Sequence, residues 1–537
     1  MELVQKSGLP EHITFDHLPT KKIEELADAT LSLLNLVAVD TSKDTHYQTK
    51  EEMELARKTL HRNVFAIDRG IYASIFCLPG AIEFARQAAF KALLSNPWRG
   101  NTKSTLPINT ENDIINKLLK ELQPNKVLNT FVEMVDNKVN NSRTRRVMLT
   151  YILGSRSLEL WSVKYKPKVL KVLTHCWGIR YKNIVKAILE NNLKDLSTPL
   201  VASFDQKEMD YLTADIFKFK NPKMSDGDMI QCIAFILGIK MDYTVKMLKA
   251  YGDAKTDLKA GAILPPDILD GIRSTYHSKT TQAEMLNLTK KTMTTKQKKL
   301  VQNKAQKEGV AVTFNPKKFP MAELFIYAYK MGMSKDIKNA INGKARKAAQ
   351  SLPFRYGRLG IVFDGSYSMS GSGEQHMRPI SIASATREML KHACENYYIE
   401  FAGGYSKDGL SYPMGDSSLA MSLAKVLENE PDAVFIISDG YENAPAGRTH
   451  EVIQVVRRLG WNLPIYHINP VSAAEAKEGV RQLSDLIPVM PISKPEAVGL
   501  TFFKPMLEVD PMNGLKSLLQ MILPMLEAPK KKKEVTQ

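Results

Sequence analysis

Cysteine is scarce in this sequence, with four residues in 537, at positions 77, 176, 232 and 394. They are widely scattered and no two form a C-x-x-C pair, so the spacing indicates neither a zinc site nor a disulfide framework. We expect all four to be reduced thiols in a protein core.

Long apolar stretches are also missing, because no run of about 18 consecutive apolar residues occurs. The first residues, MELVQKSGLPEHITFD, lack the basic-then-apolar order of a secretory signal. We therefore expect a cytoplasmic monomer that does not associate with a membrane. The length of 537 residues is too great for one hydrophobic core and favours about two to four domains.

Positive charge is in excess, with 74 Lys and Arg against 57 Asp and Glu and a formal net charge of +17. Residues 290–347 hold fifteen basic and three acidic residues, whereas residues 351–528 hold fifteen basic and twenty acidic ones. The excess thus belongs to the N-terminal two-thirds of the chain. This positive charge favours a polyanionic partner. Nucleic acid is favoured over a membrane surface, because the sequence shows no amphipathic membrane anchor beside the basic residues. The alternative is a solvated surface that keeps the protein dispersed.

The pattern of apolar residues divides the chain into four parts. Residues 1–20 contain Pro10 and Pro19 and little periodicity, and we interpret them as a loosely attached N-terminal arm. Residues 21–350 show apolar positions at three- and four-residue spacing between short polar breaks, which predicts an all-α array of stacked antiparallel helix pairs. Residues 351–528 form a separate domain, and residues 529–537 a basic tail.

One stretch of the helical part, residues 141–189, mixes cations with aromatic residues. Such a mixture can contact phosphates and stack on unpaired bases. Alternatively, the aromatic residues form helix–helix contacts and the cations line their solvated rims. The aromatic residues are Trp161, Tyr165, Trp177 and Tyr181, and the candidate nucleic-acid contacts are Arg145, Arg146, Lys164, Lys166, Lys168, Lys171, Arg180 and Lys182, to which charge alone adds Lys290 and Lys291.

After residue 351 the pattern changes to alternating strands and helices. We expect strands at 358–364, 397–404, 432–440 and 463–469, and helices at 380–396, 417–429, 451–460 and 514–523. This alternation predicts an α/β domain with a doubly wound, mostly parallel sheet, in which ligands bind at the carboxyl ends of the strands.

Oxygen-bearing side chains follow two of these strands. Asp364, Ser366 and Ser368 come at the end of the apolar run from Gly360, and Asp439 ends the strand at 432–440. Ser417 begins the intervening helix, where its hydroxyl can face the same edge or cap the helix. Carboxylates and hydroxyls suit a hard divalent cation, most of all Mg²⁺. The competing interpretation is an ordinary polar turn.

These residues resemble the metal-ion-dependent adhesion site of a von Willebrand factor A domain, whose first strand ends in D-x-S-x-S. In that family, a Thr from a middle loop and an Asp from the fourth strand complete the site. The matching positions are Asp364, Ser366, Ser368 and Asp439, and the Thr position falls on Ser417, or on Asp416 if the alignment slips by one. In such a site the metal leaves a position for an acidic side chain of a protein partner.

The N-terminal part resembles the TROVE module of the Ro ribonucleoprotein family, which carries an A domain at the same end. The resemblance rests on residues 145–175, on KKFPMAELFIYAYKMG and on IKNAINGKARKAAQSLP. Two features depart from the family pattern. The loop between Lys164 and His175 is shorter, and Phe319-Pro320 stands where His-Pro is usual.

The Ro resemblance implies a ring of HEAT-like helical repeats closed by the A domain. In the family, the hole of the ring accepts single-stranded 3′ ends of misfolded non-coding RNA, and the outer surface holds a small structured Y RNA. By position, Lys164 and His175 would contact RNA, with Arg145 and Arg146 as neighbours. Judged from its sequence alone, His175 is more typical of a hydrogen-bonded core histidine.

We find no P-loop, no Ser/His/Asp or Cys/His grouping and no nuclease-like cluster of carboxylates, and we expect a non-enzymatic RNA-binding protein. A second hypothesis is a metal-dependent protein-interaction scaffold that binds no RNA. A third is a nuclease that uses Asp364 and Asp439.

Overall fold

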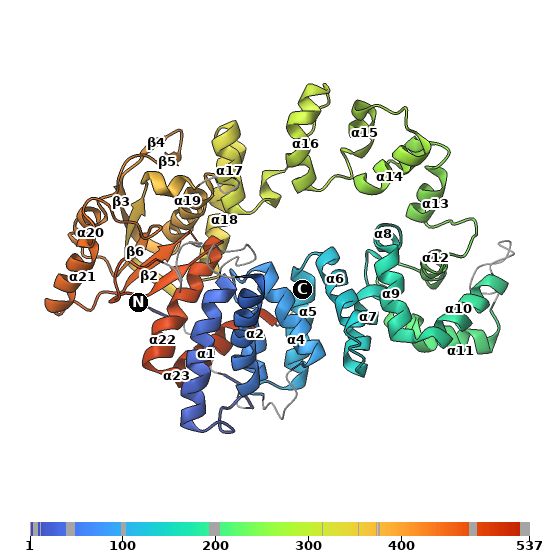
Figure 1. Cartoon of the computed structure of the whole chain (residues 1–537), viewed down its shortest axis with the longest axis horizontal. Helices are drawn as coiled ribbons and strands as arrows, with labels where there is room; N and C mark the ends of the chain where they lie inside the picture. Colours follow the sequence, from blue (N-terminus) through green and yellow to red (C-terminus); the bar gives the residue numbers. More distant parts are fainter. Residues whose placement is uncertain are drawn as a thin grey trace, which may run out of the picture. The chain divides into compact units, whose positions relative to one another are not determined.

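The computed structural model describes residues 2–3, 9–10, 12–38, 49–97, 104–192, 204–313, 315–352, 354–371, 373, 376–471 and 481–526, so the basic tail lies outside the described residues. The described chain is rich in helix and has a parallel five-stranded sheet towards its C-terminus, which confirms the coarse architecture predicted from the sequence. By contacts it divides into two compact units. The first unit joins residues 1–122 to residues 316–537, and the second unit comprises residues 123–315 (Figure 1).

The second unit is built from helices over its described residues. They are α6 (Pro124–Asp136), α7 (Ser142–Leu153), α8 (Leu158–Lys164), α9 (Lys166–Trp177), α10 (Ile179–Asn192), α11 (Gln206–Asp215), the 3₁₀ helix η1 (Phe217–Phe219), α12 (Asp226–Leu237), α13 (Lys246–Asp253), η2 (Leu258–Gly261), α14 (Pro266–Tyr276), α15 (Gln282–Thr289) and α16 (Thr295–Lys307). Helix α9 packs against α6, α7, α10 and α12, and α8 packs against α12 and α13. This packing places α8 and α9, which carry Lys164, Lys166, Lys168 and Lys171, next to α12 and α13.

Local sequence explains where these helices begin. The side chains of Asn141, Ser225, Thr281 and Thr294 each accept a hydrogen bond from a backbone N–H of the following first turn, which satisfies a donor that the helix itself leaves unpaired. Helix α9 differs, because its N-cap, Tyr165, makes no side-chain capping bond and Pro167 follows within the first turn.

The first unit also contains helices from both ends of the chain. They are α1 (Thr20–Ala38), α2 (Lys50–Ile67), α3 (Arg69–Ile75), α4 (Glu83–Ser95), α5 (Ile108–Glu121), η3 (Pro316–Lys318), α17 (Met321–Met331), α18 (Lys335–Gln350), η4 (Tyr367–Ser370), α19 (Arg378–Lys391), α20 (Leu419–Leu427), α21 (Arg448–Arg458), η6 (Pro495–Phe502), α22 (Phe503–Val509) and α23 (Pro511–Leu526). Helix α1 packs against α22 and α23, and α3 and α5 also contact α23. The N-terminal helices therefore share a core with the last helices. None of the helices in the described residues is long and apolar enough to cross a membrane.

The N-terminal arm is held more firmly than we expected. Its strand β1 (Glu2–Leu3) pairs antiparallel with Phe354 and Arg355, and Ile13 and Phe15 are buried. Apolar side chains that leave water in this way fix the arm to the first unit, so the expectation of a loose attachment is wrong for these residues.

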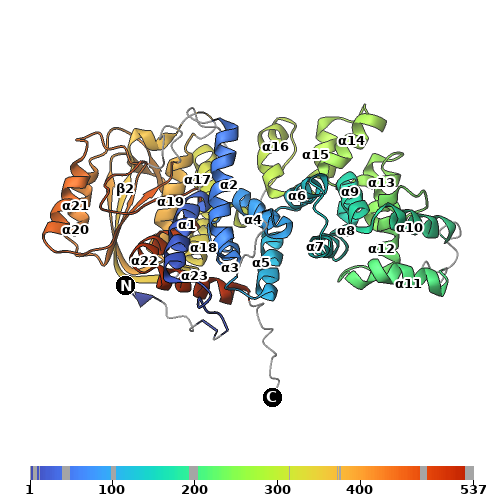
Figure 2. The ribbon, with the colours of Figure 1, turned by 60° about the horizontal axis from the view of Figure 1, so that its bottom comes forward.

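The sheet has parallel strands in the order β3-β2-β6-β7-β8. Its strands are β2 (Phe354–Asp364), β3 (Cys394–Ala402), β6 (Ala433–Ile437), β7 (Ile465–Asn469) and β8 (Val489–Pro491), and a separate hairpin is formed by β4 (Tyr405–Lys407) and β5 (Leu410–Tyr412). Helices α20 and α21 cover one face and α19 covers the other (Figure 2). On the α20–α21 face, Val362, Val434 and Ile436 pack against Leu423 and Ile453 in a buried core.

The expected strands and helices of residues 351–528 all occur, with most bounds shifted by up to five residues. The prediction is wrong for residues 394–396, which were expected to end a helix and instead begin strand β3. The sequence did not predict the β4–β5 hairpin, the short strand β8 or the pairing of β1. Each is only two or three residues long, so none carries enough alternation to produce a recognisable pattern.

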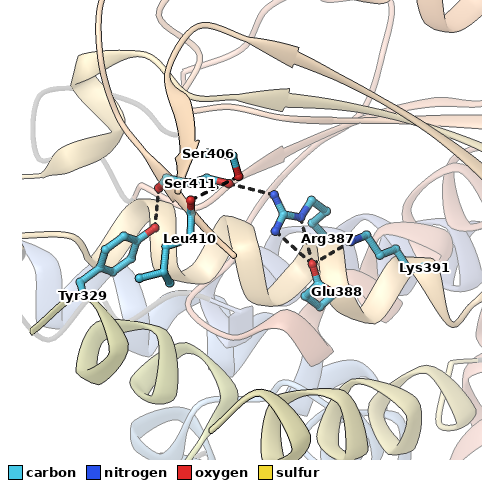
Figure 3. Close-up of polar contacts among 7 residues, drawn as sticks. All are labelled: Tyr329, Arg387, Glu388, Lys391, Ser406, Leu410 and Ser411. Atoms are coloured by element: carbon cyan, nitrogen blue, oxygen red, sulfur yellow. Dashed lines mark hydrogen bonds and ion pairs between the residues drawn. The ribbon is translucent and has the colours of Figure 1, made fainter. Parts of the chain in front are cut away.

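The hairpin is anchored by helices α17 and α19 (Figure 3). The Tyr329 hydroxyl of α17 donates to the Ser411 carbonyl at 2.5 Å, and the Arg387 guanidinium donates to the Ser411 hydroxyl at 2.9 Å. Arg387 is buried, and Glu388 pairs with both Arg387 and Lys391. These bonds hold the segment that leads from the hairpin to Ser417.

The close packing of β2 against α20 makes a testable prediction. A Cβ added at Gly360 would lie 2.3 Å from Val426 Cγ1 of α20, so we expect Gly360→Ala to lower the free energy of unfolding by about 1–3 kcal/mol. Gly343, inside α18, has open space around it, and Gly343→Ala should instead raise the free energy of unfolding by about 0.5–1 kcal/mol. Urea unfolding of both variants checks this. Equal midpoints for Gly360→Ala and the wild type would contradict the packing described.

Candidate metal site and candidate nucleic-acid interface

Two carboxylates lie at the carboxyl ends of neighbouring strands. Strand β2 ends at Asp364, and β6 is followed by Ser438 and Asp439. Because Phe363 pairs with Ile437 in the parallel register, both acids emerge at the same edge of the sheet. Both are buried.

A continuous set of hydrogen bonds joins the oxygen atoms at this edge. The Ser438 hydroxyl donates to Asp364 Oδ2 at 2.6 Å, and the Ser366 N–H donates to Asp364 Oδ1 at 2.9 Å. The hydroxyls of Ser366 and Ser368 lie 3.0 Å apart, and Ser368 acts to lower the pKa of Asp439. The structure thus brings together four of the five predicted metal ligands.

The fifth predicted ligand, Ser417, lies on a second loop, which is hydrogen-bonded to the loop that carries Ser366 and Ser368. The Met414 N–H donates to the Gly365 carbonyl, and the Tyr367 N–H donates to the Gly415 carbonyl, both at 2.9 Å. Gly403 permits this close approach, because it has a φ of +79° and a Cβ there would lie 2.7 Å from the Asp416 carbonyl oxygen.

Within this loop the two alternative ligands differ in burial. Ser417 is only 1% exposed, whereas Asp416 is exposed. Helix α20 starts at Leu419 with Ser418 as its N-cap, so Ser417 precedes the cap. Of the two, Ser417 therefore lies within the protein and Asp416 lies at its surface.

Burial controls the charge of the two acids. Burial and, to a smaller extent, the nearby Asp439 raise the pKa of Asp364, hydrogen bonds from Ser438 and Ser366 oppose the shift, and the resulting pKa is about 6. Burial also raises the pKa of Asp439, against the hydrogen bond from Ser368 and the positive charge of Arg481. A bound cation would offset the desolvation of both carboxylates.

The donor set fits a hard cation. Two carboxylates and three hydroxyls supply oxygen ligands only, which is the chemistry that Mg²⁺ prefers. In the described part of the chain, no group of three or more His, Cys, Asp or Glu side chains could hold a metal. The softer ion Zn²⁺ prefers Cys and His ligands, and the five candidate ligands include neither.

Sequence reasoning missed several residues that support the site. Ser438 bonds to Asp364, and the side chain of Asn469 donates to the Asp439 carbonyl at 3.0 Å. Arg481 lies over the Tyr441 ring, 3.2 Å from its centroid. Ser438 could have been found, because it directly precedes Asp439 at a strand end, but Arg481 is too distant in sequence to be linked to the motif.

The candidate nucleic-acid contacts of α8 and α9 gather around aromatic rings. The ammonium groups of Lys164 and Lys168 lie 5.8 and 5.7 Å from the centroid of Tyr165. Lys166 lies 4.5 Å from the centroid of Phe235, on α12. These distances are within the range of cation–π attraction.

Several predicted contacts also bond within the protein. Lys164 pairs with Asp267, Lys171 pairs with Asp136, Lys168 donates to the Asn125 side chain, and His175 Nε2 lies 2.8 Å from the Val139 carbonyl oxygen. The position of His175 is thus that of a hydrogen-bonded histidine, the interpretation favoured by its sequence alone. To bind a ligand, these four side chains must give up their bonds within the protein or share them with the ligand.

The remaining candidates lie on other helices. Arg145 and Arg146 are on α7, Arg180 and Lys182 are on α10, and Lys290 and Lys291 follow α15, which packs against α14. Arg146, Arg180 and Lys291 are exposed, and the other three are half-buried. Trp161 is buried and stacks on Tyr151, so its role is packing in the core.

The pKa of Asp364 makes Mg²⁺ binding sensitive to pH. Because its folded pKa lies above the ordinary value, loss of its proton destabilises the metal-free protein as pH rises from about 4 to 6. Mg²⁺ needs the deprotonated form, so we expect Mg²⁺ to raise the melting temperature at pH 7.5 and to have a much smaller effect at pH 5. At about 100 times its Kd, a bound ion contributes about 2.7 kcal/mol.

Three variants test which side chains hold the ion. Asp439→Asn and Ser417→Ala should reduce the Mg²⁺-dependent rise in melting temperature at pH 7.5, and Asp416→Asn, in the same loop, should retain it. Loss of the rise in Asp416→Asn but not in Ser417→Ala would instead assign the middle-loop position to Asp416.

Comparison with known proteins adds no relative. A scan against models of known protein families finds no match for this chain, and a search of curated proteins finds none either. The Ro and von Willebrand A resemblances therefore stay predictions from sequence motifs, chiefly those at Asp364 and at residues 145–175.

Proposed function

We propose that the chain is a non-enzymatic RNA-binding protein of the Ro type, with a HEAT-like helical ring and a von Willebrand factor A domain. It binds a small structured non-coding RNA, similar to Y RNA, on a basic outer surface. It accepts single-stranded 3′ ends of misfolded RNA in the hole of the ring. Its role is RNA quality control or ribonucleoprotein assembly, as a monomer in the cytoplasm.

The observation that carries this proposal is the set of cations around aromatic rings at the junction of α8 and α9. Lys164, Lys166 and Lys168 occupy alternate positions about Tyr165, and each lies within 6 Å of a ring centroid. Ammonium groups neutralise phosphates, and aromatic rings stack on unpaired bases. Such contacts bind RNA with little sequence preference, which suits recognition of misfolded RNA by its form.

The metal site has a separate role in this proposal. Mg²⁺ would be held by Asp364, Asp439 and the hydroxyls of Ser366, Ser368 and Ser417. When bound, the ion supplies a point of attachment for an acidic side chain of a protein partner. The residues of the chain keep the two carboxylates at one sheet edge and orient the hydroxyls between them.

A second candidate function is a protein-interaction scaffold that does not bind RNA. One observation favours it, an apolar groove of about 700 Å³ between α20 and α21. The groove is lined by Met421, Val455 and Leu459, which are exposed, and it starts at Ser418, beside the candidate ligand Ser417. Exposed apolar surface of this kind is typical of protein-binding sites.

The salt dependence of RNA binding tests the leading proposal. We expect the affinity for a structured RNA with a single-stranded 3′ tail to fall about a hundredfold between 50 and 200 mM salt, if roughly five phosphates of a single strand are contacted. The binding should persist in EDTA and in Asp439→Asn, because the metal site has another role. An affinity that barely changes with salt would contradict the proposal.

Two simpler observations separate the alternatives. Full-length protein purified without nuclease should carry RNA and show a raised 260/280 nm absorbance ratio, whereas the scaffold would not. RNA that stays intact with the protein and Mg²⁺ or Mn²⁺ would exclude the nuclease that uses Asp364 and Asp439.

A further inference from the structure

Two lysines from distant parts of the second unit lie close to one group of aromatic rings. Lys166 begins α9, and Lys255 follows α13. The Lys166 ammonium is 4.5 Å from the Phe235 ring centroid, and the Lys255 ammonium is 5.1 Å from the Tyr251 ring centroid. The two rings touch each other edge to face, with centroids 5.5 Å apart.

The rings fix where the two ammonium groups can go. Phe235 is buried and also contacts Tyr243 edge to face, at 5.3 Å between centroids. Tyr251 is half-buried, and Lys255 is exposed. The aromatic group therefore forms a rigid base that is open to solvent on the side of Lys255 and Tyr251.

Neither ammonium is neutralised by a carboxylate in the described residues, where no ion pair involves Lys166 or Lys255. The acids nearest to Lys255 in sequence bond elsewhere. Asp253 pairs with Lys249 at 3.3 Å, and the Asp257 side chain accepts a hydrogen bond from the Lys259 N–H.

The positive charge of Lys255 acts on Lys166. Burial lowers the pKa of Lys166, and the positive charge of Lys255 lowers this pKa further. An anion bound between the two ammonium groups would be attracted by both. The attraction is stronger here than in bulk water, because the rings exclude part of the water.

We propose that Lys166 and Lys255 together bind one phosphodiester group of single-stranded RNA, with the half-buried Tyr251 ring beside it available to a neighbouring base. The inference rests on the proposed RNA-binding function and adds a subsite to it. Lys255 and Tyr251 lie outside the basic stretch that the sequence singled out, so only the fold brings them to Lys166. A phosphodiester is preferred over an acidic peptide because a ring beside two cations matches a base joined to its phosphate.

The test measures the affinity of the full-length protein for a fluorescein-labelled single-stranded oligouridylate by anisotropy, from 50 to 200 mM KCl. Lys255→Gln and Lys166→Gln should each weaken binding about fivefold at 0.1 M salt, and neither should reduce the slope of log K against log salt by more than about 0.7, because the two lysines share one phosphate. Lys249→Gln is the matched control, because Lys249 is on α13, is exposed and already pairs with Asp253. It should bind within about twofold of the wild type.

The outcomes separate this site from the proposed function. If the wild type binds the oligouridylate and Lys255→Gln binds as Lys249→Gln does, the subsite is wrong and the general function stands. If the wild type does not bind it at any salt concentration, both are wrong. Lys166→Arg keeps the charge and should bind like the wild type, which distinguishes a lost phosphate contact from disturbed packing on Phe235.

Discussion

Asp364 and Asp439 are buried beside one another at the carboxyl ends of paired parallel strands, and much of the first unit serves to hold them there. Burial of a carboxyl group disfavours its charged form, and a proton or a nearby cation offsets this cost. The Ser438 hydroxyl donates to Asp364, the hydroxyls of Ser366 and Ser368 contact each other, and the anchored β4–β5 hairpin leads the chain to Ser417. A divalent cation is the simplest way to stabilise this arrangement at neutral pH.

The cations of the second unit follow a different principle. Lys164, Lys166 and Lys168 lie against aromatic rings. Lys164, Lys168, Lys171 and His175 are also tied to neighbouring polar groups. Such side chains are positioned before a ligand arrives, which reduces the conformational entropy lost on binding. The second unit therefore presents positive charge beside half-buried and buried aromatic rings on a helical scaffold, while the candidate metal site belongs to the first unit and its sheet.

Much of the metal site could be predicted from the sequence, because strand ends of a parallel sheet meet at one edge. The D-x-S-x-S pattern at Asp364 and the strand ending before Asp439 were enough to place four ligands together. The sequence could not decide between Ser417 and Asp416, since burial distinguishes them, and it could not find Arg481. The cationic site was less predictable. Lys255 is about ninety residues from Lys166, and only the packing of α12 and α13 against α8 and α9 relates them.

The central claim is that RNA is bound by the basic helices of the second unit and not by the metal-site loops. Photo-crosslinking of the full-length protein to a single-stranded RNA that carries 4-thiouridine, followed by mass spectrometry of the peptides, tests it most directly. The account predicts crosslinks in peptides that contain Tyr165 or Tyr251, unchanged by EDTA. Crosslinks confined to peptides around Asp364 and Asp439, or their loss in EDTA, would contradict it.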